Sequence, residues 1–405
     1  KEMIRSMVID VLQGQKQETA SSQPVKQVSH GKEPGVFDTV DEAIRAAKEA
    51  QLRFEDCTLA TREKVIADIR AAMRPRVQEL AQKTVEETGM GRVADKVLKL
   101  NLTLDKTPGI EDLVTECETG DNGMTLYELS AYGVIGAITP STNPAETLIC
   151  NSIGMLAAGN AIFFSVHPGA KNLSRELVSE LNQVIAKSIG IENLIVTLRE
   201  PSIESAQEMM LHPDVSLLVV TGGPGVVKQA LQSGKKVIGA GAGNPPAFVD
   251  ETADIKKAAQ DIVLGASLDN NILCIAEKSV VAMRQIEPQL VQEIVKVGCV
   301  LVDNQQDIQR LVDLTVLPNG TPNKQFVGKN ASVILDAAHI PYNGDPRLII
   351  LRTPKDHPFA VIEMLMPILP VITVDSFDEG LNVCLLLEAG LHHTATMHSL
   401  NMERL

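Results

Sequence analysis

The segment GVIGAITPSTNPAETLICNSIGMLAAGNAIFFSV, residues 133–166, carries the clearest structural pattern of the chain. Two apolar runs, residues 133–138 and 161–166, flank a segment, residues 145–158, whose apolar side chains recur at helical spacing. A buried strand, a helix and a second buried strand form the repeating unit of parallel sheets. The alternation continues with expected strands at residues 194–198, 216–220 and 237–240. We therefore expect an α/β fold with a doubly wound parallel sheet.

The same alternation returns downstream and predicts a second α/β region. Its expected strands lie near residues 279–283, 300–302, 332–335, 348–351 and 369–374. Upstream, residues 38–54 and 61–88 have helical spacing, and Pro75 is expected to divide the second of these helices. The sequence thus predicts two α/β domains in series, at residues 35–245 and 246–405.

Composition limits the class of function. The chain has 405 residues, with 37 Lys and Arg against 51 Asp and Glu, and a net charge of −14. This acidic balance argues against binding to nucleic acid or to anionic membranes, and no apolar run reaches the roughly 18 residues of a membrane span. The six cysteines include no CxxC pair, which fits free thiols in a reducing compartment. No cluster has metal-ligand spacing, so we expect a cytosolic enzyme without a metal.

The N-terminal segment differs from the remainder of the chain. Apolar side chains fall on one helical face of residues 1–12, while residues 13–34 have the Gln-, Ser-, Lys- and Thr-rich composition of a linker. A short amphipathic helix on a flexible linker is expected to dock onto another protein. The alternative is that the helix folds back onto its own domain.

Loops that follow the predicted strands are the first candidates for a binding site, because open α/β sheets bind ligands at the carboxyl ends of their strands. These loops are residues 139–144, 167–171 and 221–225. The last, Thr-Gly-Gly-Pro-Gly, precedes a helix and can present backbone N–H groups to a phosphate, or it is simply a tight turn. It is not the G-x-G-x-x-G fingerprint of a standard Rossmann site.

Cys274 is the candidate nucleophile. It follows the loop-forming residues Asp269, Asn270 and Asn271, whereas three other cysteines lie within apolar patterns and are interpreted as core residues: Cys150, Cys299 and Cys384. From its position alone, Cys274 is either a nucleophile or a structural thiol.

Together these segments resemble the aldehyde dehydrogenase superfamily, and within it the CoA-acylating aldehyde dehydrogenases of bacterial microcompartments, of the ethanolamine- and propanediol-utilisation type. The resemblance extends from Gly35 to Leu405. It rests on collinear segments at residues 87–91, 140–144, 167–171, 221–223, 239–246, 270–278, 365–370 and 392–395. It implies a homo-oligomer with a protruding hairpin near residues 121–132. Residues 1–12 look like an encapsulation peptide that binds shell proteins, which implies a cytoplasmic enzyme inside a microcompartment.

The resemblance implies that a short aldehyde, acetaldehyde or propionaldehyde, is oxidised with NAD and CoA to acyl-CoA and NADH. Cys274 matches the nucleophile that forms an acyl-cysteine thioester, and Asn143 matches the oxyanion-hole asparagine. Glu363 matches the glutamate that holds the nicotinamide ribose, although from the residue alone it is a solvated carboxylate before a strand. The remaining cofactor-binding residues that the resemblance implies are Thr139, Pro140, Ser141, His167, Gly169, Thr221, Gly222, Gly223 and Gly241.

Two departures from the hydrolytic members of the superfamily bear on the reaction. Residues 239–244 read Gly-Ala-Gly-Ala-Gly-Asn, where hydrolytic members carry a glutamate that activates water; its absence favours transfer to CoA. His167 stands where they usually have a lysine that contacts the adenosine ribose; it makes a similar contact or caps a turn. The alternatives are a hydrolytic enzyme that releases free acid and a non-catalytic microcompartment protein. The resemblance also implies that the chain is truncated at its C-terminus.

Overall fold

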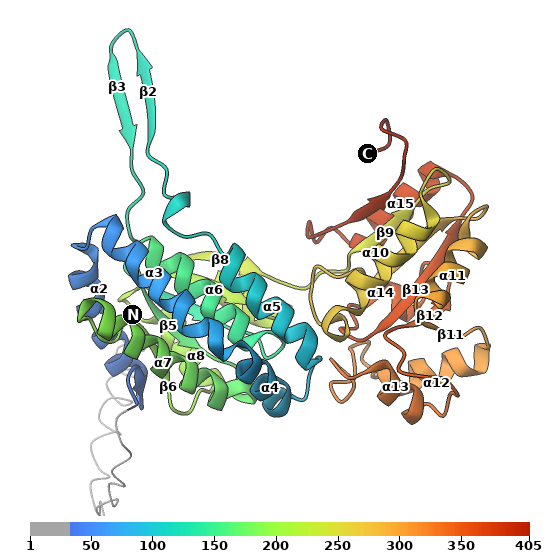
Figure 1. Cartoon of the computed structure of the whole chain (residues 1–405), viewed down its shortest axis with the longest axis horizontal. Helices are drawn as coiled ribbons and strands as arrows, with labels where there is room; N and C mark the ends of the chain where they lie inside the picture. Colours follow the sequence, from blue (N-terminus) through green and yellow to red (C-terminus); the bar gives the residue numbers. More distant parts are fainter. Residues whose placement is uncertain (1–32) are drawn as a thin grey trace, which may run out of the picture. The chain divides into compact units, whose positions relative to one another are not determined.

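The computed structural model describes residues 33–405, which contain two six-stranded parallel sheets with helices between the strands (Figure 1). The first sheet has the order β1-β6-β5-β4-β7-β8, and the second has the order β11-β12-β13-β10-β9-β14. The first sheet contains β1 (Val36–Phe37), β4 (Val134–Ile138), β5 (Ala161–Ser165), β6 (Ile195–Leu198), β7 (Val215–Thr221) and β8 (Lys236–Ala240). The second contains β9 (Pro246–Val249), β10 (Ser279–Met283), β11 (Val300–Leu301), β12 (Ile349–Arg352), β13 (Ile368–Val374) and β14 (Thr396–His398).

The helices follow the same division along the chain. Those before β9 are α2 (Val40–Glu55), α3 (Leu59–Met73), α4 (Val77–Thr88), α5 (Val93–Lys106), α6 (Pro144–Ala157), α7 (Lys171–Ile189), α8 (Ile203–Leu211) and α9 (Pro224–Leu231). Those after it are α10 (Ile255–Ser267), α11 (Glu287–Lys296), α12 (Gln305–Thr315), α13 (Ala331–Ala337), α14 (Pro358–Val361) and α15 (Phe377–Glu388). Short 3-10 turns are η1 (Arg74–Arg76), η2 (Ile110–Asp112), η3 (Pro168–Ala170) and η4 (Leu268–Asn271). The predicted division at Pro75 is confirmed, since η1 separates α3 from α4.

The chain winds the first sheet in two directions from β4. From β4 it proceeds outward through β5 and β6, and it then returns to β7 on the other side of β4. This reversal makes the sheet doubly wound, as predicted. It also brings the loop after β4 beside the loop after β7, since Ile138 pairs with Val220. A ligand site is expected at such a reversal.

One predicted strand is wrong. Residues 332–335 lie in the helix α13, and Ile334 and Leu335 are buried in a core cluster with Ile308 and Leu311 of α12. A short apolar run fits a buried helix face as well as a buried strand, because periodicity over so few residues does not separate them. The other predicted strands are present within a residue or two of their expected ends.

The hairpin lies earlier in the chain than its prediction near residues 121–132. It consists of β2 (Glu116–Gly120) and β3 (Gly123–Tyr127), an antiparallel pair whose residues are all exposed (Figure 1). Neither face of the hairpin packs on a core, and its apolar residues Met124, Leu126 and Tyr127 are all exposed, so no buried face marks where the hairpin begins and ends.

The predicted docking helix at residues 1–12 and most of the linker at 13–34 lie outside the described residues. Within residues 33–405, no helix combines the length and apolarity needed to cross a membrane. The same part of the chain contains no group of three or more His, Cys, Asp or Glu side chains placed to hold a metal ion.

Candidate active site

The loops after β4 and β7 form the first half of the site. Thr139 follows β4 and is buried, and its Oγ1 has no hydrogen-bond partner among residues 33–405. Pro140 and Ser141 are half-buried in the same loop, which ends where α6 begins at Pro144. An orphaned hydroxyl at the carboxyl end of a central strand fits a bound polar group, since buried polar atoms are normally paired.

Glycines after β7 leave room at the N-terminus of α9. A side chain at Gly222 would meet Val226 at 2.8 Å, so close packing requires this glycine. A Cβ at Gly223 would meet no atom within 4 Å. Thr221 ends β7, and Gly223 is the N-cap residue of α9. Open space before exposed N–H groups fits an approaching phosphate.

His167 caps a turn, which was the simpler of its two interpretations. Its Nδ1 accepts a hydrogen bond from the backbone N–H of Gly169 at 3.0 Å. Burial lowers the pKa of His167, and the positive charge of Lys324 lowers it further. The imidazole is therefore neutral at pH 7, with Nδ1 occupied by the turn and Nε2 as its remaining polar atom.

Cys274 lies half-buried between η4 and β10, next to residues from three other segments. A Cβ at Gly243 would stand 2.7 Å from the carbonyl oxygen of Cys274 and 3.0 Å from the ring of His393. The N–H of Gly243 donates to Oε1 of Glu363 at 3.1 Å. The glycine-rich segment thus packs directly on the loop that contains Cys274. Gly241, by contrast, has no atom within 4 Å of the place where its Cβ would be.

Glu363 is half-buried and held in place, so its interpretation as a solvated carboxylate is wrong. Burial raises the pKa of Glu363, against the opposing effects of the Gly243 N–H, Lys278 and His393. Burial and the charge of Glu363 both raise the pKa of the Cys274 thiol, whereas Lys278 lowers it. Burial is the largest of these effects, and Lys278 is the nearby charge that favours the thiolate.

Lys278 organises the loop that leads to Cys274. Its buried Nζ donates to the backbone oxygen of Asn271 at 2.7 Å, to Oδ1 of Asn271 at 2.6 Å and to the backbone oxygen of Leu273 at 2.8 Å. Burial lowers the pKa of Lys278 to about 8. Asp269, Asn270 and Asn271 all have left-handed φ values, of 50°, 57° and 65°, which Asn and Asp adopt most readily after glycine. Sequence reasoning missed Lys278 as a site residue.

Asn143 connects to the same loop through a lysine. Nζ of Lys99 donates to Oδ1 of Asn143 and, at 2.5 Å, to Oδ2 of Asp269. No hydrogen bond joins Asn143 directly to Cys274 among residues 33–405. Lys99, like His393, was not among the predicted site residues.

The cysteines other than Cys274 differ from expectation at one position. Cys299 and Cys384 are buried, and burial raises the pKa of each thiol to about 12. Cys150, expected in the core, is exposed on α6 beside the buried Ile149. Adjacent residues on a helix point in different directions, so an apolar neighbour does not place a side chain inside.

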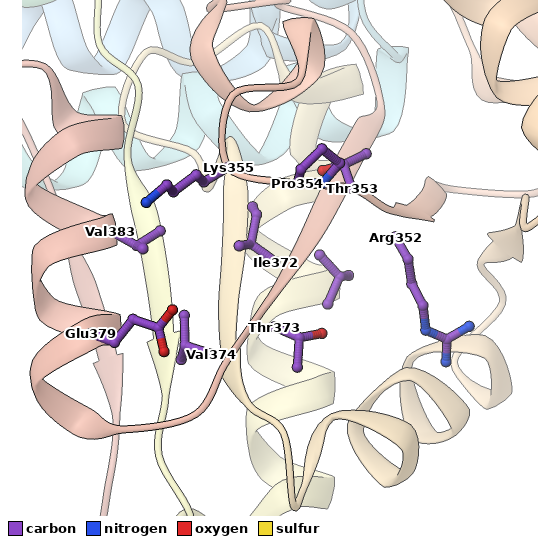
Figure 2. Close-up of a pocket in the computed structure, with 10 residues that line it drawn as sticks. Arg352, Thr353, Pro354, Lys355, Ile372, Thr373, Val374, Glu379 and Val383 are labelled. Carbon is purple, nitrogen blue, oxygen red and sulfur yellow. The ribbon is translucent and has the colours of Figure 1, made fainter.

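A pocket of about 310 Å³ lies away from these residues, at the carboxyl end of β12 and along β13. Figure 2 shows Lys355, Thr373 and Glu379 among its lining side chains. None of the predicted site residues lines it. Cys274, in contrast, precedes the amino end of β10.

A family model, a similar protein and a solved structure all relate this chain to aldehyde dehydrogenases. A model of the aldehyde dehydrogenase family matches residues 13–404. A CoA-propanoylating propanal dehydrogenase of Citrobacter freundii is 50% identical over 372 residues, which cover 92% of this chain and 80% of that protein. A Rhodopseudomonas palustris propionaldehyde dehydrogenase, solved with bound CoA and an acylated cysteine, has a TM-score of 0.90 at 45% identity, covering 91% of this chain and 85% of its own.

A second solved structure is a propionaldehyde dehydrogenase from the Clostridium phytofermentans fucose-utilisation microcompartment. It has a TM-score of 0.89 at 46% identity and covers 92% of this chain and 85% of its own. These likenesses extend through both sheets.

Proposed function

The chain belongs to the aldehyde dehydrogenase family, and we propose that it is the CoA-acylating kind, which oxidises a short aldehyde with NAD and CoA to acyl-CoA and NADH. One observation carries this proposal. Gly243 packs on Cys274, and the segment that contains it, residues 239–244, has no carboxylate. A nucleophilic thiol is thus next to backbone where a hydrolytic enzyme needs a base. Propanal and acetaldehyde differ by one methylene, worth only about 1–3 kcal/mol, so both are proposed substrates.

The residues of the first half-site fit a dinucleotide. The unpaired Thr139 Oγ1 can bind a polar group, and the open N-terminus of α9 at Gly223 can accept a phosphate. Gly243 binds Oε1 of Glu363, so Oε2 can accept a hydrogen bond from a ribose hydroxyl. Thr221, Gly222, Pro140, Ser141, His167, Gly169 and Gly241 complete the proposed cofactor-binding set. When bound, NAD supplies the hydride acceptor and CoA supplies the thiol that receives the acyl group.

The protein's own groups carry the remaining chemistry. The Cys274 thiolate adds to the aldehyde carbon, and negative charge develops on the carbonyl oxygen. Asn143 Nδ2 and the backbone N–H of Cys274 donate to that oxygen. Loss of hydride from the former aldehyde carbon, to the acceptor that NAD would supply, leaves an acyl-cysteine thioester. This thioester persists until a thiol attacks it, because residues 239–244 offer no base to activate water.

The test measures NADH formation from propanal and NAD with and without CoA. With CoA, turnover is sustained and propanoyl-CoA accumulates. Without CoA, NADH stops near one equivalent per active site as the thioester accumulates. Sustained NADH formation and free propanoate without CoA would establish the hydrolytic alternative. Failure of Cys274 to react with iodoacetamide, with no NADH formed, would favour a non-catalytic protein.

We further propose that the enzyme resides in a cytoplasmic microcompartment, delivered by binding of residues 1–12 to shell proteins across the linker at 13–34. The microcompartment origin of a similar solved protein supports this. We also propose domains at residues 35–245 and 246–405 and a homo-oligomer built through the exposed hairpin β2–β3. A fluorescent reporter fused to residues 1–12 tests the delivery: a reporter that stays outside microcompartments contradicts it.

A further inference from the structure

Four charged side chains form a buried cluster between α5, α6 and the Cys274 loop. Lys96 and Lys99 come from α5, Glu146 from α6, and Asp269 from the loop that leads to Cys274. Asp269 Oδ2 lies 2.9 Å from Nζ of Lys96 and 2.5 Å from Nζ of Lys99, and Glu146 Oε1 lies 3.3 Å from Nζ of Lys99. All four side chains are less than 10% exposed.

The cluster holds two positive and two negative charges. Burial would raise the pKa of Asp269, but the two lysines lower it. Burial likewise works against the charge of Lys99, yet Glu146 and Asp269 raise its pKa. A balanced buried cluster of this kind contributes little net stability compared with apolar residues of the same volume. Its presence beside Asn143 and Cys274 therefore calls for a role other than stability.

Lys99 determines which way the Asn143 amide faces. An ammonium group only donates hydrogen bonds, so the group that Asn143 presents to Lys99 must be Oδ1. The amide nitrogen then faces the other way, where its contact with Thr142 Oγ1 is long, at 3.3 Å. Since the oxygen and nitrogen of an amide have nearly the same size, an Asn143 without Lys99 can rotate and present oxygen to a developing oxyanion.

We propose that Lys99 is a positioning residue for the reaction, which locks the Asn143 amide so that Nδ2 is available to the aldehyde oxygen in the transition state. This rests on the proposed function and on the oxyanion role of Asn143. Through Asp269, the same ammonium holds the start of the Cys274 loop. Lys96 pairs with the same Asp269 oxygen, so this loop keeps a positive partner when Lys99 is replaced, whereas the Asn143 side chain does not.

Lys96 provides the matched control. It is fully buried and pairs with the same Asp269 oxygen, but its other hydrogen bond goes to the backbone oxygen of Thr142, at 2.7 Å. Burial lowers the pKa of Lys96, whereas the pKa of Lys99 is raised. Lys96→Met and Lys99→Met therefore remove the same charge from the same cluster. Only Lys99→Met frees the Asn143 side chain.

The experiment is a double-mutant cycle on kcat for propanal oxidation, with Lys99→Met, Asn143→Ala and the double variant. Asn143→Ala should lower kcat by about 10²–10³-fold, as loss of an oxyanion-hole donor does. Lys99→Met should lower kcat by roughly 10–100-fold with little change in KM, because the lost interaction acts in the transition state. The double variant should be no slower than Asn143→Ala alone, since Lys99 acts through Asn143. Lys96→Met combined with Asn143→Ala should give multiplying losses.

Three readouts decide between this inference and its failures. Alkylation of Cys274 by iodoacetamide does not use the oxyanion hole. Its rate in Lys99→Met should therefore stay within about twofold of the wild-type rate. If Lys99→Met loses both the alkylation rate and kcat, the Cys274 loop is displaced and the positioning role is overturned. Multiplying losses from Lys99→Met and Asn143→Ala also overturn it. If the wild-type chain forms no acyl-CoA, the proposed function itself fails, whereas an active wild type with an unaffected Lys99→Met variant refutes only the inference.

Discussion

The two sheets place their functional residues at opposite strand ends. In the first sheet, the loops after β4 and β7 meet at the reversal of strand order, and the unpaired Thr139 hydroxyl is found there. In the second sheet, Cys274 precedes β10, and the carboxyl end of β12 has a pocket without any predicted site residue. The rule that ligands bind at carboxyl ends of parallel strands thus leads to the proposed cofactor residues but not to the proposed nucleophile.

The largest effect is expected at the amino end of β10. Cys274→Ser should lower kcat by at least about 10⁴-fold, because a hydroxyl without a positioned base is a poor nucleophile. NADH formation measures the loss of activity. The affinity for NADH, measured from the change in NADH fluorescence on binding, should stay within a few-fold of the wild-type value. Cys384→Ser serves as the control, since Cys384 is a core thiol. If Cys274→Ser keeps its activity, Cys274 is not the nucleophile.

Lys278 gives a pH-dependent test of the same loop. Its pKa is about 8 in the folded protein against an ordinary value of 10.5, so between these values the unfolded chain binds the extra proton. The free energy of unfolding therefore gains a contribution that rises from pH 8 to about 10.5. Lys278→Met should lack this rise and should lose about 3 kcal/mol at pH 7, since three acceptors lose their donor.

Urea unfolding of both proteins at several pH values measures the difference. Lys257→Met, which removes an exposed pair with Asp261, should cost less than about 0.5 kcal/mol at every pH. A wild-type stability curve parallel to that of Lys278→Met from pH 8 to 10 would contradict the lowered pKa of Lys278.

Gly223 tests the first sheet. Gly223→Ala should fold normally, because its φ of −65° suits alanine and its Cβ meets no atom within 4 Å. The methyl group should nevertheless raise KM for NAD several-fold by occupying the space before α9. Gly222→Ala, in contrast, should lower the melting temperature, since its Cβ would stand 2.8 Å from Val226. If the KM for NAD is unchanged in Gly223→Ala, the NAD phosphate does not bind at the N-terminus of α9.

The smallest effect is expected in the pocket beyond β12. Lys355→Ala should change kcat and KM for NAD by less than about twofold, as surface substitutions away from a site do. Steady-state kinetics suffices. A tenfold change would mean that both ends of the second sheet take part in the reaction.

Buried parallel strands were predictable because both of their faces are apolar, as in residues 133–138. The segment at 332–335 is similarly apolar but lies in a helix, and the apolar residues Met124 and Leu126 of the hairpin are exposed, so no buried face marks its ends. The sequence pattern does not predict that Lys99 is buried. Helix α5 buries Lys96 and Lys99, whereas Leu98 and Leu102 are 62% and 60% exposed. Amphipathic patterning assumes the reverse. The loop position of Cys274 made it a candidate nucleophile or a structural thiol, whereas the role of Asn143 was implied only by the resemblance, since the spacing of the two residues alone does not place one beside the other.

The charge-balanced cluster restricts how this sequence can change. Losing any one of Lys96, Lys99, Glu146 or Asp269 leaves a buried charge uncompensated, which costs about 3–5 kcal/mol. Removing an opposite pair together restores neutrality, so each single step destabilises the fold while the paired step does not. Drift at these positions must therefore proceed in concert across α5, α6 and the nucleophile loop. Homologous enzymes with this arrangement are expected to keep all four charged residues together.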